Sequence, residues 1–373
     1  MKKYNSTNER IKREYFAFLK EAKRQSENAV DAAAMAIARF ETDTKWRDFK
    51  AFRFEQAVAF KHRLASQESR TTGKKLSKAT LNSTLAHLKR FFQWLALQPG
   101  YKSRLSYSDA EYFNLSEKDS RIATARRPRA VSTVEQIKHV LAMMPTASAI
   151  DRRNRALIAF TLLTGARDSA IASIKLKHVD LSAGTVFQDA REVNTKFSKS
   201  FTTTFFPVGD NIRQIVADWV AYLREALFWG NDDPLFPATL VALDPTQQFH
   251  AAGLARKHWS NAGPIRGIFK GAFEAAGLPY FHPHSFRNTL VCLGETLCQT
   301  PEAFKAWSQN LGHEGVLTTF TSYGSVDPRR QDEIIQSLRL CQLGVDANTI
   351  RMAEAIVQQM RKGGLLGAAG CVA

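Results

Sequence analysis

The stretch GARDSAIASIKLKHVDL, residues 165–181, decides how the rest of the chain is interpreted. A helix is predicted over residues 152–164, and Gly165 breaks it. A second helix is predicted over residues 168–175, so Arg167 stands at the junction of the two. Taken alone, an arginine at such a break is most simply a surface residue that caps a helix.

The hydrophobic pattern changes period after this stretch. Residues 185–191 and 201–208 are predicted strands, and they flank the polar turn 192–200. Helical periodicity then returns, and Thr300 followed by Pro301 marks the start of one more helix. Helices are predicted in this half over residues 134–144, 210–229, 256–276, 285–298 and 300–310. The region therefore combines several helices with one small antiparallel sheet.

The N-terminal segment, residues 1–116, is predicted to be helical and is strongly basic. Helices are predicted over residues 29–40, 49–64 and 78–97, with Ser77 as the N-cap of the last. Ten basic residues and one acidic residue lie between Lys61 and Arg104, and residues 1–132 carry +14 of the total charge of +17. Because each phosphate that a basic side chain neutralises releases counterions, this segment favours nucleic-acid contact over a merely solvated surface.

Composition narrows the class of protein. A length of 373 residues indicates two domains, and a 44% hydrophobic and 23% charged composition is that of a globular protein. A net charge of +17 favours a polyanion, with nucleic acid ahead of an anionic membrane surface. No apolar run approaches a membrane span, the basic N-terminus lacks the apolar part of a secretory signal, and the four cysteines have no CxxC spacing. We therefore expect a cytoplasmic protein associated with the nucleoid.

Several nucleotide and metal motifs are missing. The sequence contains no GxxxxGK[ST] phosphate loop, no HExxH, no GxSxG and no GxGxxG after a strand. His282 and His284 could form a metal pair, but no carboxylate or cysteine lies near them in sequence to complete a site. We therefore expect neither a metal nor another cofactor.

Five residues are candidates for chemistry. His284 and Arg287 lie three residues apart, so both can face one side of a helical turn, while Arg167 lies far upstream. His313 follows a glycine that ends a helix, and Tyr323 comes ten residues later. Two guanidinium groups can neutralise the non-bridging oxygens of a phosphodiester, a phenol can attack phosphorus, and imidazoles can move protons. Each residue singly is more simply structural, but jointly they compose a metal-free phosphoryl-transfer site.

The order and local sequence of these residues resemble the tyrosine recombinase (phage integrase) family. TGAR contains Arg167, HSFR contains His284 and Arg287, LGH contains His313, and Tyr323 follows in the family's order. The resemblance covers residues 60–330 and implies a mainly α fold with a small antiparallel β-sheet. It implies a helical core DNA-binding domain over 1–117, a basic linker over 118–132, an α+β catalytic domain over 133–330 and a C-terminal helical tail over 331–373.

The family also uses a lysine on the turn between two strands, and here the sequence offers two. Lys196 is preferred because it follows the first strand as the family lysine does, and Lys199 is the alternative. Ala170 departs from the pattern, because the family usually has an acidic residue three after the first arginine; Asp168 is nearby but points elsewhere on a helix. The spacing from His313 to the tyrosine is ten instead of the common nine, which a bulge would absorb.

The resemblance implies a site-specific recombinase that cuts and rejoins duplex DNA through a 3′-phosphotyrosyl intermediate, without metal or ATP. In this mechanism Tyr323 attacks the scissile phosphate while Arg167 and Arg287 hold its oxygens. Lys196 protonates the leaving 5′-oxygen. His284 assists deprotonation of the tyrosine, and His313 hydrogen-bonds the phosphate.

The implied partners are double-stranded DNA and three further copies of the chain, since recombination needs four active sites. The tail 331–373 either docks on a neighbouring protomer or packs on its own domain, and the sequence favours neither. DNA contacts are predicted at Lys74, Lys75, Lys78, Arg126, Arg127 and Arg129. The target site, the kind of genetic element and any directionality factors are left open.

Three other functions compete with this one. A type IB topoisomerase would use the same chemistry but only relax DNA. A DNA-binding regulator on the same scaffold would have lost catalysis. A protein that binds anionic membranes is disfavoured, because no long basic amphipathic helix with an aromatic face is present.

Overall fold

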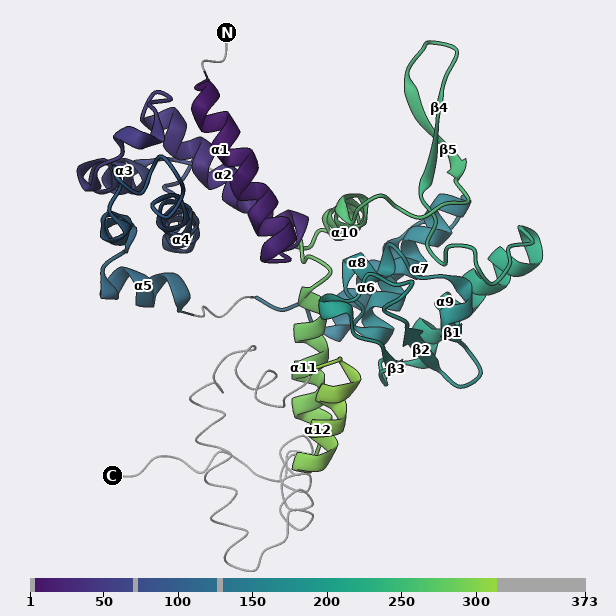
Figure 1. Cartoon of the computed structure of the whole chain (residues 1–373). Helices are drawn as coiled ribbons and strands as arrows, with labels where there is room; N and C mark the ends of the chain where they lie inside the picture. Colours follow the sequence, from purple (N-terminus) through teal and green to yellow (C-terminus); the bar gives the residue numbers. More distant parts are fainter. Residues whose placement is uncertain (1–3, 70–72, 126–129, 314–373) are drawn as a thin grey trace, which may run out of the picture. The chain divides into compact units, whose positions relative to one another are not determined.

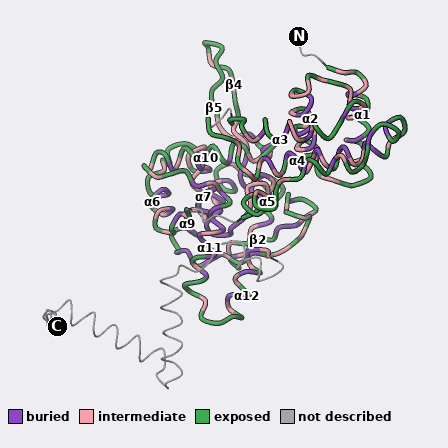
Figure 2. Tube along the Cα trace, turned by 90° about the vertical axis from the view of Figure 1, so that its left-hand side faces the viewer, coloured by how far each residue is buried: buried purple, intermediate pink, exposed green. Residues whose placement is uncertain are grey.

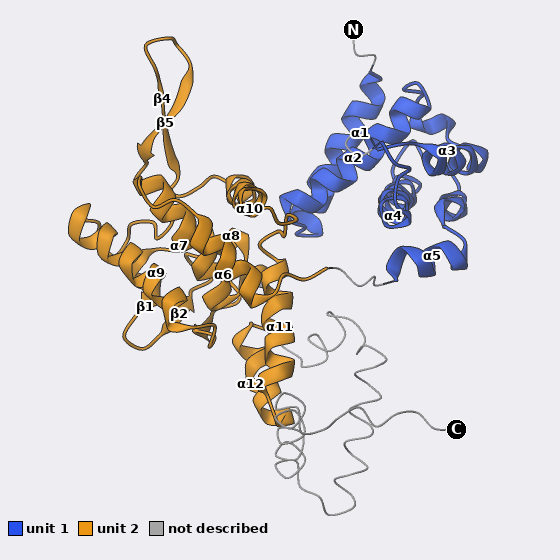
Figure 3. Cartoon of the chain, turned by 180° about the vertical axis from the view of Figure 1, so that it is seen from behind, with its two compact units in different colours: residues 1–126 blue, residues 127–373 orange. Residues whose placement is uncertain are grey.

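The computed structural model describes residues 4–69, 73–125 and 130–313. The chain divides into two compact units, Met1–Arg126 and Arg127–Ala373 (Figure 3). Helices dominate both units, and the strands form two small antiparallel sheets in the second unit (Figure 1). The predicted fold class is therefore confirmed.

The first unit is a helical bundle built around α4. Its helices are α1 (Ser6–Ala17), α2 (Glu27–Asp43), α3 (Phe54–Ser66), α4 (Lys78–Leu95) and α5 (Glu117–Thr124). Ser77 caps α4 as predicted, because its hydroxyl accepts from the Thr80 N–H at 3.1 Å. The apolar stripe of α4 is buried, and the rings of Phe52 and Phe92 stack with centroids 3.9 Å apart.

Helix α5 corrects the predicted linker. Residues 118–132 were expected to be an irregular connection, but residues 117–124 form a helix that packs against α4. Ser116 caps the helix by accepting from the Asp119 N–H at 3.1 Å, and Lys78 pairs with Asp119 at 2.9 Å. No residue of α5 is buried, so the helix lacks the apolar periodicity that would have predicted it.

The second unit is organised around one buried helix, α7 (Ala149–Thr164). Every residue from Ala156 to Thr164 is buried, and Figure 2 shows this inner position in purple. The other helices are α6 (Val134–Met143), α8 (Asp168–Ile171), α9 (Asp210–Ala221), α10 (Gly263–Ala275), α11 (Ser285–Leu297) and α12 (Pro301–Asn310). Helices α6, α9 and α11 contact α7, which therefore lies at the centre of this unit.

The small sheet follows α8 directly. Its strands are β1 (Val179–Asp180), β2 (Thr185–Gln188) and β3 (Phe201–Thr204), in the antiparallel order β1-β2-β3. Val186 pairs with Thr203, which fixes the register of β2 against β3. Both predicted strands exist but end three or four residues early, and α8 has one turn instead of the two predicted.

A β-hairpin that the sequence did not predict precedes α10, and α10 itself is shorter than expected. Strands β4 (Thr239–Leu243) and β5 (Phe249–Leu254) form a two-stranded sheet that extends from the second unit (Figure 1). Residues 256–276 were expected to be helical, but α10 begins only at Gly263. Several apolar residues of the hairpin are exposed, Phe249 by 79%, so the strands lack the alternation that identifies a half-buried strand.

Helices α11 and α12 pack closely at a glycine. The indole N–H of Trp307 donates to the Leu290 carbonyl at 2.8 Å, and the indole lies over Gly294. A Cβ at residue 294 would stand 2.6 Å from the indole nitrogen, so only glycine fits beneath this ring. This contact sets the position of α12 and of the residues that follow it.

We predict that Gly294→Ala destabilises the second unit by about 1–3 kcal/mol, because the added methyl group overpacks the α11–α12 contact. Gly267→Ala is the matched control, since Gly267 also lies inside a helix but a Cβ there meets nothing within 4 Å. It should be neutral or stabilising by up to about 1 kcal/mol. Calorimetric melting of both variants checks this, and equal melting temperatures would contradict it.

Candidate active site

The glycine of the TGAR box allows close packing of the helices around the site. Gly165 ends α7 in the left-handed conformation, with φ of 61°. A Cβ there would stand 2.8 Å from Leu311 Cδ2 and 3.0 Å from Leu290 Cδ1. The glycine therefore lets the end of α7 approach both α11 and the residue that follows α12.

Arg287 joins three of the predicted boxes. Its side chain lies on α11 and is only 2% exposed. Nη1 donates to the Gly165 carbonyl at 2.7 Å, and Nη2 donates to the Leu311 carbonyl. Nη2 also lies 2.8 Å from Nε2 of His313. A guanidinium can only donate, so His313 Nε2 accepts and its ring proton lies on Nδ1.

The end of α12 is held against the small sheet. The Asn310 side chain accepts from the Thr204 N–H at 2.7 Å and donates to the Thr204 carbonyl at 2.8 Å, as a neighbouring strand would. Thr203 Oγ1 donates to the Asn310 carbonyl at 3.1 Å. These bonds place His313, three residues later, between the sheet and α11.

Both candidate histidines are neutral at pH 7. His284 directly precedes α11, and burial of its ring, then the charges of Arg287 and Arg167, lower its pKa to about 4. The pKa of His313 is also lowered to about 4, first by burial and then by Arg287, Arg167, His284 and Lys196. All five described candidates therefore lie within one electrostatic neighbourhood.

Lys196 belongs to the same electrostatic neighbourhood. Its side chain is exposed at the start of a short 3₁₀ turn, Lys196–Ser198. The charge of Lys196 lowers the pKa of His313. The alternative, Lys199, directly follows this turn and is half-buried.

The predicted nucleophile and part of the basic set lie outside the described residues. These are Tyr323, Arg126, Arg127 and Arg129. Lys74 and Lys75 are exposed on the turn before α4, while Lys78 pairs with Asp119. Lys78 is thus partly neutralised in the structure.

Several residues that shape the site were not predicted from sequence. Asp168 pairs with Arg266 of α10 at 2.8 Å. Ala170 is buried, so its side chain fills core space. Asn310, Ser169 and Ser173 act through hydrogen bonds to main-chain groups, and nothing in their identity or spacing signals such contacts. Only Asn310 had a position, directly before the LGH box, that could have indicated a role in the site.

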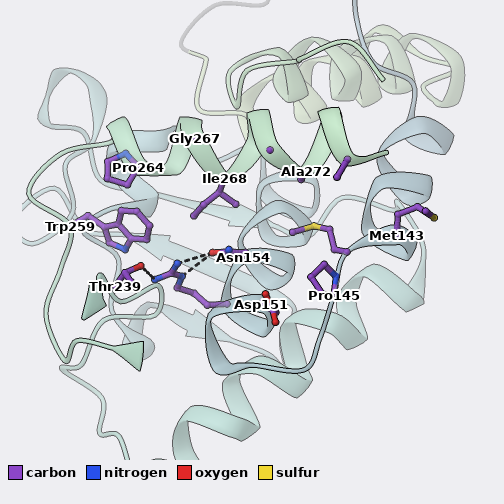
Figure 4. Close-up of a pocket in the computed structure, with 14 residues that line it drawn as sticks. Met143, Pro145, Asp151, Asn154, Thr239, Trp259, Pro264, Gly267, Ile268 and Ala272 are labelled. Atoms are coloured by element: carbon purple, nitrogen blue, oxygen red, sulfur yellow. Dashed lines mark hydrogen bonds between the residues drawn. The ribbon is translucent and has the colours of Figure 1, made fainter. Parts of the chain in front are cut away.

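The second unit also contains a pocket that none of the candidate residues lines. Its volume is about 500 Å³, and it lies between the start of α7, the end of α6 and α10 (Figure 4). Arg153 borders it but is saturated by the Asn154 side chain, the Pro237 carbonyl and the Thr239 hydroxyl. None of the five described candidates lines this pocket, so its size does not make it the active site.

A match to a protein-family model supports the family that the site residues indicate. The model of the phage integrase family matches residues 131–330. The chain belongs to the phage integrase family. The resemblance inferred from the boxes is therefore confirmed.

Curated relatives of this family are similar to half or more of the chain. The tyrosine recombinase XerC of Halalkalibacterium halodurans is 26% identical over 190 residues, which are 50% of this chain and 54% of that protein. The XerC of Ralstonia pickettii is 26% identical over 71% of this chain and 75% of its own. The chain thus spans about half the length of one relative and three quarters of the other.

Two solved structures share the fold of this integrase-family chain. A lambda integrase dimer bound to a COC′ core site has a TM-score of 0.57 at 13% identity, covering 84% of this chain and 96% of that one. The Tn1549 transposon integrase in complex with transposon right end DNA has a TM-score of 0.56 at 14% identity, covering 88% of this chain and 99% of that one.

The described residues contain no helix long and apolar enough to cross a membrane, and no cluster of three metal-binding side chains.

We predict that Arg167→Gln raises the pKa of both His284 and His313. A positive charge disfavours the imidazolium form, so its removal shifts each titration upward from about 4, while burial and Arg287 keep both below the ordinary 6.5. NMR titration of isotope-labelled histidines measures this. Arg224→Gln, which contacts Asn231 instead, is the control. Histidines that titrate near 6.5 in the unmodified chain would contradict the prediction.

Proposed function

We propose that this chain is a site-specific DNA recombinase that acts through a covalent phosphotyrosyl link. The observation that carries the proposal is geometric: Arg287 bonds to the Gly165 and Leu311 carbonyls and lies 2.8 Å from His313. The charges of Arg167 and Lys196 also act on His313. Cationic groups brought this close repel one another, and such an arrangement is favourable only when an anion binds among them. A DNA phosphate supplies that charge.

The arginines stabilise the phosphate, and the histidines handle protons. Arg287 is held rigidly by two carbonyls, so its positive charge needs no reorganisation when the phosphorane forms. His313, with Nε2 occupied by Arg287, offers its Nδ1–H to the phosphate. His284 is neutral and can therefore accept the phenol proton, and its basicity rises once the phosphate charge is nearby.

The covalent step exchanges one phosphate ester for another. The Tyr323 oxygen bonds to phosphorus and the bond from phosphorus to the 5′-oxygen breaks. The phenol proton passes to His284, and Lys196 gives a proton to the leaving 5′-oxygen. Because the phosphotyrosyl ester retains the bond energy, the reverse attack by a 5′-hydroxyl needs no ATP, and arginines carry the stabilisation that a metal would otherwise supply.

The first unit is proposed to grip the duplex. Residues 61–104 carry ten basic and one acidic residue, which suits sequence-independent phosphate contact. Lys74 and Lys75 are exposed there, and the proposed contact set extends to Lys78, Arg126, Arg127 and Arg129. Exchange between two duplexes requires four protomers, with the tail 331–373 as a candidate contact between them.

We predict that Tyr323→Phe abolishes covalent capture of duplex DNA on denaturing gels, because the phenylalanine has no nucleophilic oxygen. Tyr280→Phe, which removes the hydroxyl of an exposed tyrosine that precedes the HSFR box, should leave capture unchanged. Arg167→Ala should slow capture by about a hundredfold or more, the cost of removing one group that stabilises a developing oxyanion.

Covalent capture, duplex binding and DNA relaxation together separate the competing functions. Trapped DNA with Tyr323→Phe would refute the nucleophile. Duplex binding without any covalent complex would identify a catalytically inactive regulator. Relaxation of supercoiled DNA without exchange between two marked duplexes would identify a topoisomerase-like activity.

A further inference from the structure

The turn between β2 and β3 carries Lys196, and two serines of another segment hold it. The Asn194 N–H donates to Ser173 Oγ at 2.8 Å, and Ser169 Oγ donates to the Asn194 carbonyl at 3.2 Å. Both main-chain polar groups of Asn194, two residues before the lysine, are therefore bound by side-chain hydroxyls. Ser169 lies in α8, and Ser173 lies two residues after the end of that helix.

The two hydroxyls are oriented for this task. The Ser173 hydroxyl donates to the Ser169 and Ala170 carbonyls, both at 3.2 Å, which turns its lone pairs toward the Asn194 N–H. The Ser169 N–H donates to Asp168 Oδ1 at 3.0 Å, and Asp168 is itself held by Arg266. The serines thus belong to a connected network of hydrogen bonds and are not independent surface groups.

The same segment positions a second candidate residue. Arg167 immediately precedes α8, and its carbonyl accepts from the Ile171 N–H at 2.9 Å. Residues 167–173 therefore carry Arg167 at one end and bind the lysine's turn at the other. The turn has other anchors too: Val193 is buried, Glu192 pairs with Lys177 at 2.8 Å, and the Ala190 N–H donates to Ser200 Oγ at 2.9 Å.

Lys196 needs such support because its side chain is exposed and long. A flexible ammonium group protonates a leaving oxygen efficiently only when the main chain that carries it is fixed, and a misplacement of about 1 Å can cost a hundredfold in rate. Serine hydroxyls that bind the main chain fix the turn without adding a charge near the phosphate. Their loss would leave Arg287 and the histidines in place while Lys196 moved.

We propose that Ser169 and Ser173 are positioning residues for proton transfer by Lys196. This inference rests on the proposed function, in which Lys196 protonates the leaving 5′-oxygen. It predicts a specific failure: the serine variants lose proton donation to the leaving group and retain the other parts of catalysis.

The test compares two leaving groups in single-turnover cleavage by the full chain. The substrate is a nicked duplex with a sequence recovered by covalent capture from a random library, made either with the normal 5′-oxygen or with sulfur at that bridging position. A thiolate leaves without a proton, so cleavage of the sulfur substrate does not need a general acid. Ser169→Ala alone and Ser169→Ala with Ser173→Ala are compared with Lys196→Ala.

The double serine variant should cleave the oxygen substrate about tenfold or more slowly, and the sulfur substrate within about twofold of the unmodified chain. The single variant should show the same pattern more weakly. Ser182→Ala, which removes a serine from the other turn of the same sheet, should change neither rate. Equal loss on both substrates, or no loss on either, would overturn the inference.

Lys196→Ala distinguishes this outcome from failure of the proposed function. It should be slow on oxygen and restored on sulfur. If sulfur does not restore it, the role of Lys196 is wrong whatever the serines do. If sulfur restores Lys196→Ala but not the serine variants, the proposed function stands and the positioning role is wrong.

Discussion

The site depends on one buried guanidinium. A buried charge is costly unless hydrogen bonds compensate it, and the two terminal nitrogens of Arg287 obtain theirs from the Gly165 and Leu311 carbonyls and from His313. These acceptors belong to separate segments, so the arginine can be buried only when the ends of α7 and α12 meet beside α11. The cost of burying the charge thereby enforces the geometry of the site, and Gly165 and Gly294 provide the close approach that this geometry requires.

Burial and the charge of Arg287 together set the protonation state of the neighbouring histidines. Burial and the positive field of Arg287 and Arg167 keep His284 and His313 neutral at pH 7, although each imidazole sits among cations. The site without DNA thus carries its charge on arginine and lysine and keeps its histidines available as proton acceptors and donors. An incoming phosphate would offset the repulsion and raise both histidine pKa values, which couples binding to proton transfer.

Sequence predicted the family and the buried elements better than the exposed ones. The boxes around Arg167, Arg287 and His313 were recognisable because their function depends on side-chain types in a fixed order. The stripe of α4 was predictable because burial imposes a period on the sequence. Helix α5 and the hairpin β4–β5 were missed because each is largely exposed and burial leaves no pattern. Ser169, Ser173 and Asn310 were missed because they bind main-chain atoms, which carry no sequence signal.

The most direct test is a structure of the chain with a nicked duplex trapped at the scissile phosphate. The account predicts that the non-bridging oxygens lie within hydrogen-bonding distance of Arg167 and Arg287, with His313 Nδ1 facing the phosphate and the Tyr323 hydroxyl in line with the leaving 5′-oxygen. A phosphate bound elsewhere on the protein, or a Tyr323 hydroxyl that no protomer brings near the two guanidinium groups, would contradict it.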